Sequence, residues 1–273
     1  MSSYRGESLP LALSADLHRS LLGVVRESGA SLFMVLQAGL AALLTRLGAG
    51  TDIPIGSPIA GRTDGALDDL IGFFVNTLVL RTDTSGNPSF RELVARVRTG
   101  NLSAYGHQDL PFERLVEVLN PARSLSRRPL FQVMLALQNT AEVKLELDGL
   151  SCRFERVATS SAKFDLSVSV GEERTADGAP AGIGGVVEYA TDLFDRASVE
   201  ALTDRFVRLL EAAVADPERA IGTIDILAPA ERAIILHAWN DTSRALPPAT
   251  LPELFAAQVA KTPDAVAVVH EDV

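Results

Sequence analysis

Few residues in this sequence have the types and spacing that catalysis or metal binding requires. A Gly-x-Gly-x-x-Gly loop, a Gly-x-Ser-x-Gly elbow and a His-Glu-x-x-His helix are all absent from the 273 residues. The histidines are scattered singly, at His18, His107, His237 and His270, and the single cysteine, Cys152, excludes an internal disulfide and a cysteine-based zinc cage. The sequence therefore predicts no metal site and no catalytic residue of these kinds.

The sharpest polar cluster is the segment His107-Gln108-Asp109-Leu110-Pro111-Phe112-Glu113. It places four polar side chains around the predicted start of a helix, which two apolar residues anchor. One explanation is a capped helix, with Asp109 near the positive end of the helix dipole. The other is a surface that a partner recognises. Composition alone favours the capped helix.

Capping residues and helical spacing of apolar residues predict the helices that position such side chains. Caps at both ends bracket a helix over residues 15–28 and a second over 32–47, which is apolar nearly all round and must be covered on most sides. Two further helices open with a capping box, a serine or threonine followed three residues later by a glutamate. The predicted helices cover about residues 15–28, 32–47, 89–103, 111–119, 195–213, 229–239 and 250–262.

Runs of apolar and alternating residues predict the strands. Residues 53–59 and 73–80 are too continuously apolar for a half-exposed sheet, which predicts two central strands. Residues 130–138 and 164–170 alternate with a period of two, and 186–189 is a further strand. Five or six strands with these helices predict an α/β fold, a layered mixed sheet with flanking helices.

Composition and charge exclude some classes of function. The chain carries 25 basic and 35 acidic side chains, a formal net charge of −10, which disfavours broad binding to phosphate backbones. The longest apolar stretch, Leu32 to Leu44, is interrupted by Gln37 and falls short of the roughly 18 apolar residues that a membrane span needs. No secretory signal is visible. We therefore expect a cytoplasmic protein that binds neither nucleic acid nor membrane.

The character of the chain changes after Asp216-Pro217. A small helix and the polar, proline-containing run 240–249 are typical of a linker. A helix and a strand over 266–269 follow, too little to bury a core of their own, so their apolar side chains are expected to be uncovered and poorly ordered. The expected domains are a first domain over residues 1–216, a linker over 217–249 and the start of another domain over 250–273.

Three segments, in this order, resemble the late motifs of the condensation domains of nonribosomal peptide synthetases. They are Ile71-Gly72-Phe73-Phe74-Val75-Asn76-Thr77-Leu78, the segment His107–Glu113, and Ser126-Arg127-Arg128-Pro129-Leu130-Phe131-Gln132-Val133. The resemblance extends from about residue 4 to residue 216. Residues 239–242 and 250–269 are similar to the linker and the opening segment of the adenylation domain that follows such a domain.

The family's catalytic His-His-x-x-x-Asp-Gly motif is absent, since no two histidines are adjacent. The resemblance therefore implies the C-terminal lobe of a two-lobed domain of the chloramphenicol acetyltransferase type, with the active-site histidine on the N-terminal lobe. No catalytic residue is carried over to this chain, so we expect it to be inactive alone. We expect the segment from Leu130 to Tyr189 to expose part of the face where the other lobe docks, and to favour self-association.

The resemblance implies a place in secondary metabolism, such as antibiotic biosynthesis. The family forms an amide bond between an upstream acyl or peptidyl thioester and the amine of a downstream aminoacyl thioester, both held on phosphopantetheine arms of carrier domains. The implied partners are the N-terminal lobe, the upstream and downstream carrier domains and an adenylation domain, while the chain itself binds no cofactor. The alternatives are a condensation-like domain that has lost catalysis and recruits another protein, and an epimerisation or heterocyclisation relative, against which the adenylation-like tail argues.

In such a family a tunnel runs between the two lobes, and three polar side chains are candidates for its wall. Ser57 and Asn76 each lie in an otherwise apolar strand, where a buried polar group needs a partner. That partner is either an internal hydrogen bond or a ligand. Asp165 lies on the polar face of its strand, which faces either solvent or the tunnel.

Other polar residues near these motifs are expected to have structural roles. Arg62 and Arg81 lie at strand ends, where they are expected to pair with Asp64, Asp68 or Asp83. The residues assigned such roles are Arg62, Arg81, His107, Gln108, Asp109 and Arg128.

Overall fold

The computed structural model describes residues 3–62, 65–67, 69–122, 124, 127–138, 159–245 and 248–270. Asp64, Asp68 and Cys152 lie outside the described residues. The chain divides into two compact units, Met1–Ile226 and Leu227–Val273.

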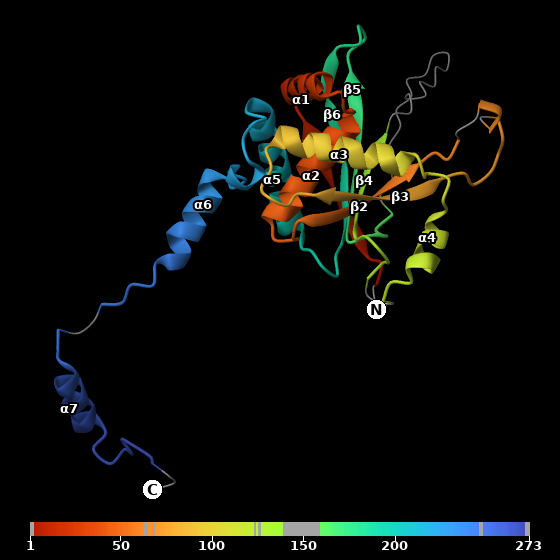
Figure 1. Ribbon diagram of the computed structural model, residues 1–273. Coiled ribbons are helices and arrows are strands. Elements are labelled where there is room, and N and C mark those ends of the chain that lie inside the picture. Colours follow the sequence, from red (N-terminus) through yellow and green to blue (C-terminus); the bar gives the residue numbers. More distant parts are fainter. Residues whose placement is uncertain are drawn as a thin grey trace, which may run out of the picture. The chain divides into compact units, whose positions relative to one another are not determined.

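The first unit is built on a six-stranded mixed sheet (Figure 1). Its strands are β1 (Gly6–Leu13), β2 (Asp52–Ile59), β3 (Asn76–Asp83), β4 (Val133–Gln138), β5 (Leu166–Arg174) and β6 (Pro180–Ala190). Their order across the sheet is β1-β6-β5-β4-β2-β3, with β4 parallel to both of its neighbours and every other pair antiparallel. The β2–β4 pairing is the shortest, with Ile55 opposite Val133 and Gly56 opposite Met134.

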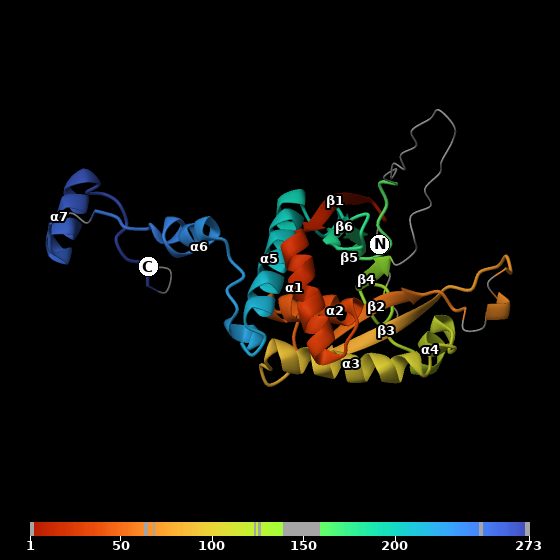
Figure 2. The same ribbon diagram turned by 90° about the horizontal axis from the view of Figure 1, so that it is seen from above.

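Helices α1, α2, α3 and α5 gather on one face of this sheet (Figure 2). The cap expected at Ser14 is present, because its hydroxyl accepts a hydrogen bond from the Leu17 N–H, and Gly29 takes the left-handed conformation that ends α1. The helices of this unit are α1 (Ala15–Ser28), α2 (Leu32–Arg46), α3 (Phe90–Tyr105), α4 (Phe112–Leu119) and α5 (Arg196–Ala215), with 3₁₀ turns η1 (Gly65–Leu67) and η2 (Ile221–Thr223).

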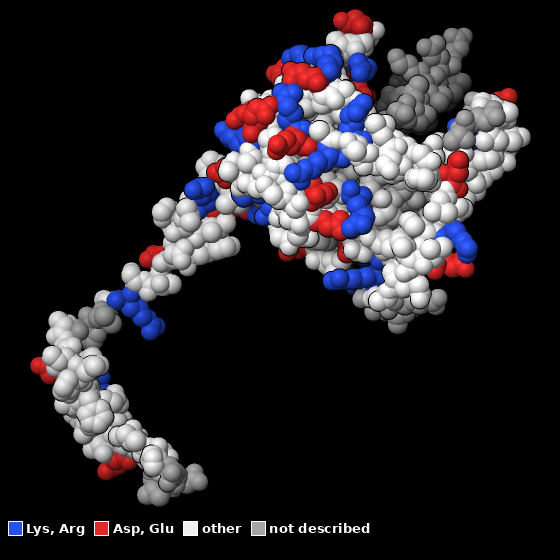
Figure 3. Space-filling view, in the orientation of Figure 1, with Lys and Arg blue, Asp and Glu red and all other residues white. Residues whose placement is uncertain are grey.

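The core lies between the helices and the sheet. Every second strand residue faces the helices, as Leu9, Leu11 and Leu13 of β1 do, each at most 3% exposed. α2 is buried along most of its length, as its all-round apolar sequence predicts, because α3, α5 and the sheet surround it. Charged side chains of both signs spread over the outer helical surface (Figure 3).

A polar network crosses this core. The Gln37 Nε2 atom donates to the Thr82 hydroxyl at 3.0 Å, and Asn101 Nδ2 donates to Gln37 Oε1 at 2.7 Å. All three residues are buried, and they join α2, β3 and α3. Each amide therefore finds a partner inside the core, as buried polar groups must.

Two strand predictions were wrong. The strand expected over residues 73–80 begins at Asn76, because its partner β2 ends at Ile59, which pairs with Asn76. It lies at the edge of the sheet and not in its centre. Phe73 precedes the strand and is 92% exposed. Residues 266–269 form no strand among the described residues, since no neighbouring strand pairs with them.

Strand β1 was not predicted at all. Its alternation of buried leucines with exposed Ser8, Pro10 and Ala12 is the signal that could have identified it.

The first unit extends past the boundary expected at residue 216. The Pro217 and Arg219 carbonyls accept hydrogen bonds from the backbone N–H groups of Arg91 and Phe90. Ile221, Ile224 and Ile226 are buried in the core. The ten residues after Asp216 thus pack with the first unit, because they cover apolar surface at the start of α3.

The second unit contains α6 (Pro229–Leu236), the 3₁₀ turn η3 (Ala238–Asn240) and α7 (Leu251–Lys261). The capping box predicted at Thr250 and Glu253 is present. On α7, Leu251 and Phe255 are 82% and 59% exposed. These two apolar side chains are therefore largely uncovered, although the helix itself is formed.

Among the described residues, no single helix is long and apolar enough to cross a membrane. α1 and α2 meet that test of length and composition only as a pair, and they are bent by 105° relative to each other.

Candidate functional site

Asn76, at the start of β3, uses both ends of its side-chain amide. Its Nδ2 atom donates to the carbonyl oxygens of Gln108 (2.9 Å) and Leu110 (2.8 Å). Its Oδ1 atom accepts from the backbone N–H groups of Phe112 (3.0 Å) and Thr77 (2.8 Å). This side chain therefore fastens the turn before α4 to the edge of the sheet.

The hydrogen bond from the Phe112 N–H to Asn76 Oδ1 caps the N-terminus of α4. Pro111, the residue at the N-cap position, makes no side-chain cap bond. His107 and Asp109 are exposed, while Gln108 is half-buried. The start of α4 is thus capped from β3, because the Asn76 side chain accepts from the first free N–H of the helix.

Three phenylalanine rings lie side by side next to this turn. The Phe112 ring meets the Phe131 ring edge to face at 5.7 Å between centroids, and Phe131 stacks on Phe164 at 5.2 Å. Phe131 is 2% exposed, and its ring covers Gly56 of β2, where a Cβ atom would stand 2.1 Å from the ring. Sequence analysis missed this cluster, although a glycine inside an apolar strand is a sign of such close approach.

Arg128 extends the cluster toward the N-terminus. Its guanidinium lies 5.5 Å from the Phe164 ring centroid and 5.6 Å from that of Tyr4, and its Nε donates to the Lys163 carbonyl at 2.5 Å. Arg128 therefore contacts both the N-terminal segment and the residues just before β5.

The three motif segments therefore meet at one place. Asn76 of the first binds the backbone of the second, and Phe112 of the second packs on Phe131 of the third. They come from β3, α4 and the approach to β4, which the sheet brings together. We call this group of residues 76, 108–112 and 131 the motif junction.

Replacing Asn76 by alanine is expected to lower the free energy of unfolding by about 1–3 kcal/mol, because the turn before α4 loses its bonds to β3. Hydrogen exchange of the Phe112 amide should speed up before global unfolding. Asn240→Ala is a matched control, since Asn240 caps α6 in the second unit through the Ile235 and Leu236 carbonyls. Unchanged exchange at Phe112 in Asn76→Ala would contradict the fastening role.

Asp165 lies immediately before β5 and is half-buried. Burial raises the pKa of its carboxyl above the ordinary value of 3.8, and the positive charge of Arg127 opposes that rise. Its neighbour Leu166 faces the helices, so by alternation Asp165 faces the opposite side of the sheet.

Because the pKa of Asp165 is raised in the folded protein, its charged form destabilises that protein at neutral pH. The favourable contribution of the carboxyl is complete below about pH 3.8 and is lost as the pH rises through the folded pKa. Asp165→Asn is therefore expected to raise the melting temperature at pH 7 and to have no effect near pH 3, as differential scanning calorimetry would measure. A lower melting temperature at pH 7 would show instead that the carboxylate makes a favourable bond.

The three candidates for a tunnel wall do not lie on one face. Ser57 is buried at 6% exposure and pairs with Leu78 across β2 and β3. Asn76 and Leu78 are two residues apart, so Ser57 and Asn76 are both on the helix-facing side, whereas Asp165 is on the other. Of the three, only Asn76 belongs to the motif junction.

The two arginines at strand ends have partners that the sequence did not predict. Arg81 forms an ion pair with Asp52 at 2.6 Å, not with Asp83, because Arg81 pairs in register with Pro54 and Asp52 lies two residues away on the same face. This pairing lowers the pKa of Asp52. Arg62 donates to the Leu70 carbonyl at 2.6 Å and stacks over the Phe74 ring, while its expected partners Asp64 and Asp68 lie outside the described residues.

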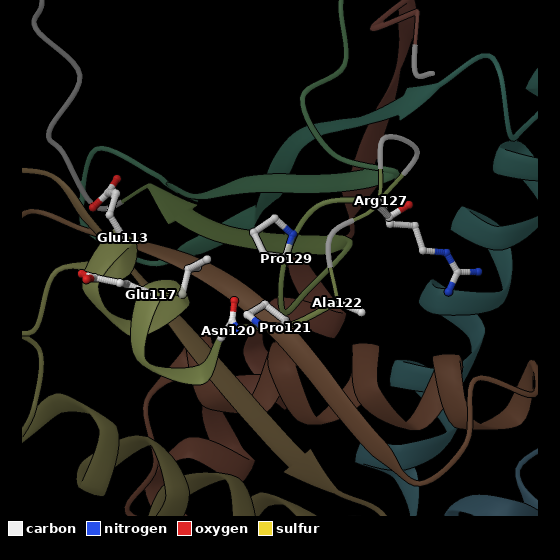
Figure 4. Close-up of a pocket in the computed structure, with 9 residues that line it drawn as sticks. Glu113, Glu117, Asn120, Pro121, Ala122, Arg127 and Pro129 are labelled. Carbon is white, nitrogen blue, oxygen red and sulfur yellow. The ribbon is translucent and has the colours of Figure 1, made fainter.

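A pocket of about 530 Å³ lies beside α4, with Pro121, Ala122 and Pro129 among the residues that line it outside the helix (Figure 4). Val116, Pro121 and Pro129 line it, together with Glu113 and Glu117 of α4. No group of three histidine, cysteine, aspartate or glutamate side chains in the described part of the chain could hold a metal ion.

Known proteins similar to this chain are large synthetases. The chain is 57% identical over 270 residues to a dimodular nonribosomal peptide synthase of Bacillus subtilis (strain 168), and 55% identical over 272 residues to CymA, a probable non-canonical nonribosomal peptide synthetase of Salinispora arenicola (strain CNS-205). These matches cover 99% and 100% of the chain but only 11% and 3% of the two synthetases. The chain thus spans a small part of its relatives.

Solved structures agree on the fold. The X-domain from teicoplanin biosynthesis is 39% identical, with a TM-score of 0.78 over 83% of this chain and 51% of that one. The four-domain synthetase AB3403 matches 97% of this chain and 21% of its own length, with a TM-score of 0.81 and 23% identity, which supports the fold alone. The expected mixed α/β architecture of the chloramphenicol acetyltransferase type is confirmed.

The model of the condensation-domain family matches residues 1–236, most of the chain and all of the motif junction. With relatives that are nonribosomal peptide synthetases, the resemblance seen in the three motifs is confirmed at the level of the family. The chain belongs to the condensation-domain family of nonribosomal peptide synthetases.

Proposed function

We propose that the chain is the acceptor-side, C-terminal half of a condensation domain that forms an amide bond between two carrier-bound thioesters. In the proposed step, the amine nitrogen of the aminoacyl thioester attacks the carbonyl carbon of the acyl or peptidyl thioester. A carbon–nitrogen bond forms, the carbon–sulfur bond breaks, the amine loses a proton, and the upstream phosphopantetheine thiol is released. Both arms belong to carrier domains, so they are substrates and not cofactors of this chain.

The observation that carries this proposal is the motif junction. Three segments that resemble the family's late motifs are separated by tens of residues, yet Asn76, Phe112 and Phe131 join them directly. In the proposal, this junction supports the wall beside which the reaction partners are held, and correct positioning alone lowers a bimolecular barrier. The match to about half of the X-domain structure supports a second half of similar size beside this one.

In the proposed division of labour, the histidine that serves as base or positions the amine lies on the N-terminal half. The motif junction, Ser57 and Asp165 belong to this half, with Ser57 and Asp165 as the remaining candidates for the tunnel wall. Because the Asn76 amide is fully used by backbone groups, we assign it to the support of that wall. The second unit would lead into an adenylation domain, whose core would cover the apolar side chains of α7.

The proposal is tested by complementation between two halves. The chain is mixed with the separately expressed polypeptide that precedes the matching segment in the Bacillus subtilis relative, and with an acyl-loaded and an aminoacyl-loaded carrier domain. Mass spectrometry of the downstream carrier should detect the amide product only when both halves and both loaded carriers are present. An unloaded upstream carrier is the control.

Product formed by this chain alone would overturn the proposed division of labour. Absence of product from a mixture in which gel filtration shows a complex of the two halves would overturn the proposed function.

A further inference from the structure

Residues 217–226, which we call the strap, cap the start of α3. Phe90 and Arg91 are the first two residues of this helix, and N–H groups at such positions have no partner inside a helix. The Phe90 N–H donates to the Arg219 carbonyl at 3.2 Å, and the Arg91 N–H donates to the Pro217 carbonyl at 2.9 Å. The first turn of α3 thus depends on a segment that is distant in the sequence.

Further contacts hold the strap in place. The Gly222 N–H donates to Asn87 Oδ1 at 2.6 Å, and the Arg46 guanidinium donates to the Gly222 carbonyl. Ile221 and Ile224 are at most 1% exposed. A Cβ atom at position 222 would stand 2.5 Å from Asn87 Oδ1, so a side chain there would push this contact apart. The strap is therefore a docked segment, and the chain continues from it directly into the second unit.

The other end of α3 leads into the motif junction. The Gln108 N–H donates at 3.3 Å to the carbonyl of Tyr105, the last residue of α3, and the Gln108 carbonyl accepts from Asn76 Nδ2 at 2.9 Å. Figure 2 shows α3 running from the segment after α5 at one end to α4 at the other. Two hydrogen bonds thus join the last turn of α3 to β3, and the rigid helix connects them to the strap.

The strap has two arrangements, docked and released. Release would take the protein acceptors away from the Phe90 and Arg91 N–H groups and expose the Ile221 side chain, so the docked arrangement is the stable one. Segments of this kind open by local unfolding, ahead of the rest of the protein. Because the strap continues into the second unit, a contact made by that unit can favour one arrangement over the other.

We infer that the strap is a conformational device: its docking on the start of α3 sets how firmly the motif junction is held, and its release loosens that junction. A partner that pulls on the second unit then acts on the turn before α4 without touching it. The inference does not depend on amide-bond formation, and its test uses no reaction.

The test is hydrogen exchange of the complete chain under native conditions, followed by nuclear magnetic resonance, in the variant Gly222→Ala. The added methyl group disrupts the contact that docks the strap. The amides of Phe90 and Arg91 should exchange about two- to tenfold faster, the range for loss of one hydrogen bond, and the Phe112 amide should exchange faster with them. Arg46→Met removes the bond to the Gly222 carbonyl without adding bulk to the strap, and it should change the same amides in the same direction.

Gly39→Ala is the matched control. Its Cβ atom would also stand 2.5 Å from a side chain, that of Leu210, but between α2 and α5 and not at the strap. It should change exchange at Phe112 no more than exchange at the centre of the sheet. Faster exchange at Phe90 with unchanged exchange at Phe112 in Gly222→Ala would overturn the inference. Unchanged exchange at both amides in the two strap variants would overturn it as well, because the strap would then not hold the start of α3.

Discussion

Replacing Phe131 by alanine is expected to lower the free energy of unfolding of the first unit by about 3–5 kcal/mol, the range for large aromatic side chains in a core. The Phe131 ring fills the space above Gly56 and contacts the Phe112 and Phe164 rings. Its removal therefore leaves a cavity bordered by Gly56 and by these two rings. Backbone glycine at position 56 cannot close that cavity. Urea unfolding followed by circular dichroism would measure the loss.

The control for this variant is Phe255→Ala. Phe255 is 59% exposed on α7 in the second unit, so its removal should leave the unfolding of the first unit unchanged. Phe131→Leu should cost less than Phe131→Ala because it refills part of the space. A loss below about 1 kcal/mol in Phe131→Ala would mean that the three motif segments do not depend on this ring.

Gln37→Leu is expected to produce the second large effect, a decrease of about 2–5 kcal/mol in the free energy of unfolding. Leucine removes the acceptor of the Asn101 amide and the donor to Thr82, and it leaves both polar groups buried at 2% and 1% exposure. Each buried group without a partner costs about 1–3 kcal/mol. The same urea experiment measures this change.

The triple replacement Gln37→Leu/Asn101→Leu/Thr82→Val distinguishes the effect of unpaired buried polar groups from the effect of changed packing. Because it removes all three polar groups together, it should cost less than the sum of the three single replacements. Strictly additive losses would show that shape and not hydrogen bonding sets the stability at this place.

Local elements could be predicted from the sequence because their signals are local. The caps at Ser14 and Ser31 and the capping box at Ser89 lie within a few residues of the helices that they start, and α1, α2 and α3 follow the predicted bounds closely. The alternation of β1 is a local signal, but its pairing with β6 is not. The edge position of β3 likewise depends on the order of all six strands, which no single strand shows.

The candidate site likewise combines features that are visible in the sequence with contacts that only the fold creates. Asn76 could be recognised as a polar residue in an apolar strand, but three of its four partners lie 32 to 36 positions further along the chain. Only the folded backbone shows that they are carbonyl and N–H groups of a helix start. Phe112, Phe131 and Phe164 are unremarkable as apolar residues, and their contact arises from the sheet that brings three segments together.

The pairing of the first strand with the last has a consequence for synthesis on the ribosome. Gly6 of β1 pairs with Ala190 of β6, so β1 finds its partner strand only after 184 further residues have been added. At roughly 5–20 residues per second, that delay is about 10–40 s. During this interval the apolar stripe of Leu9, Leu11 and Leu13 has no strand to join, so its burial waits for the last strand of the sheet.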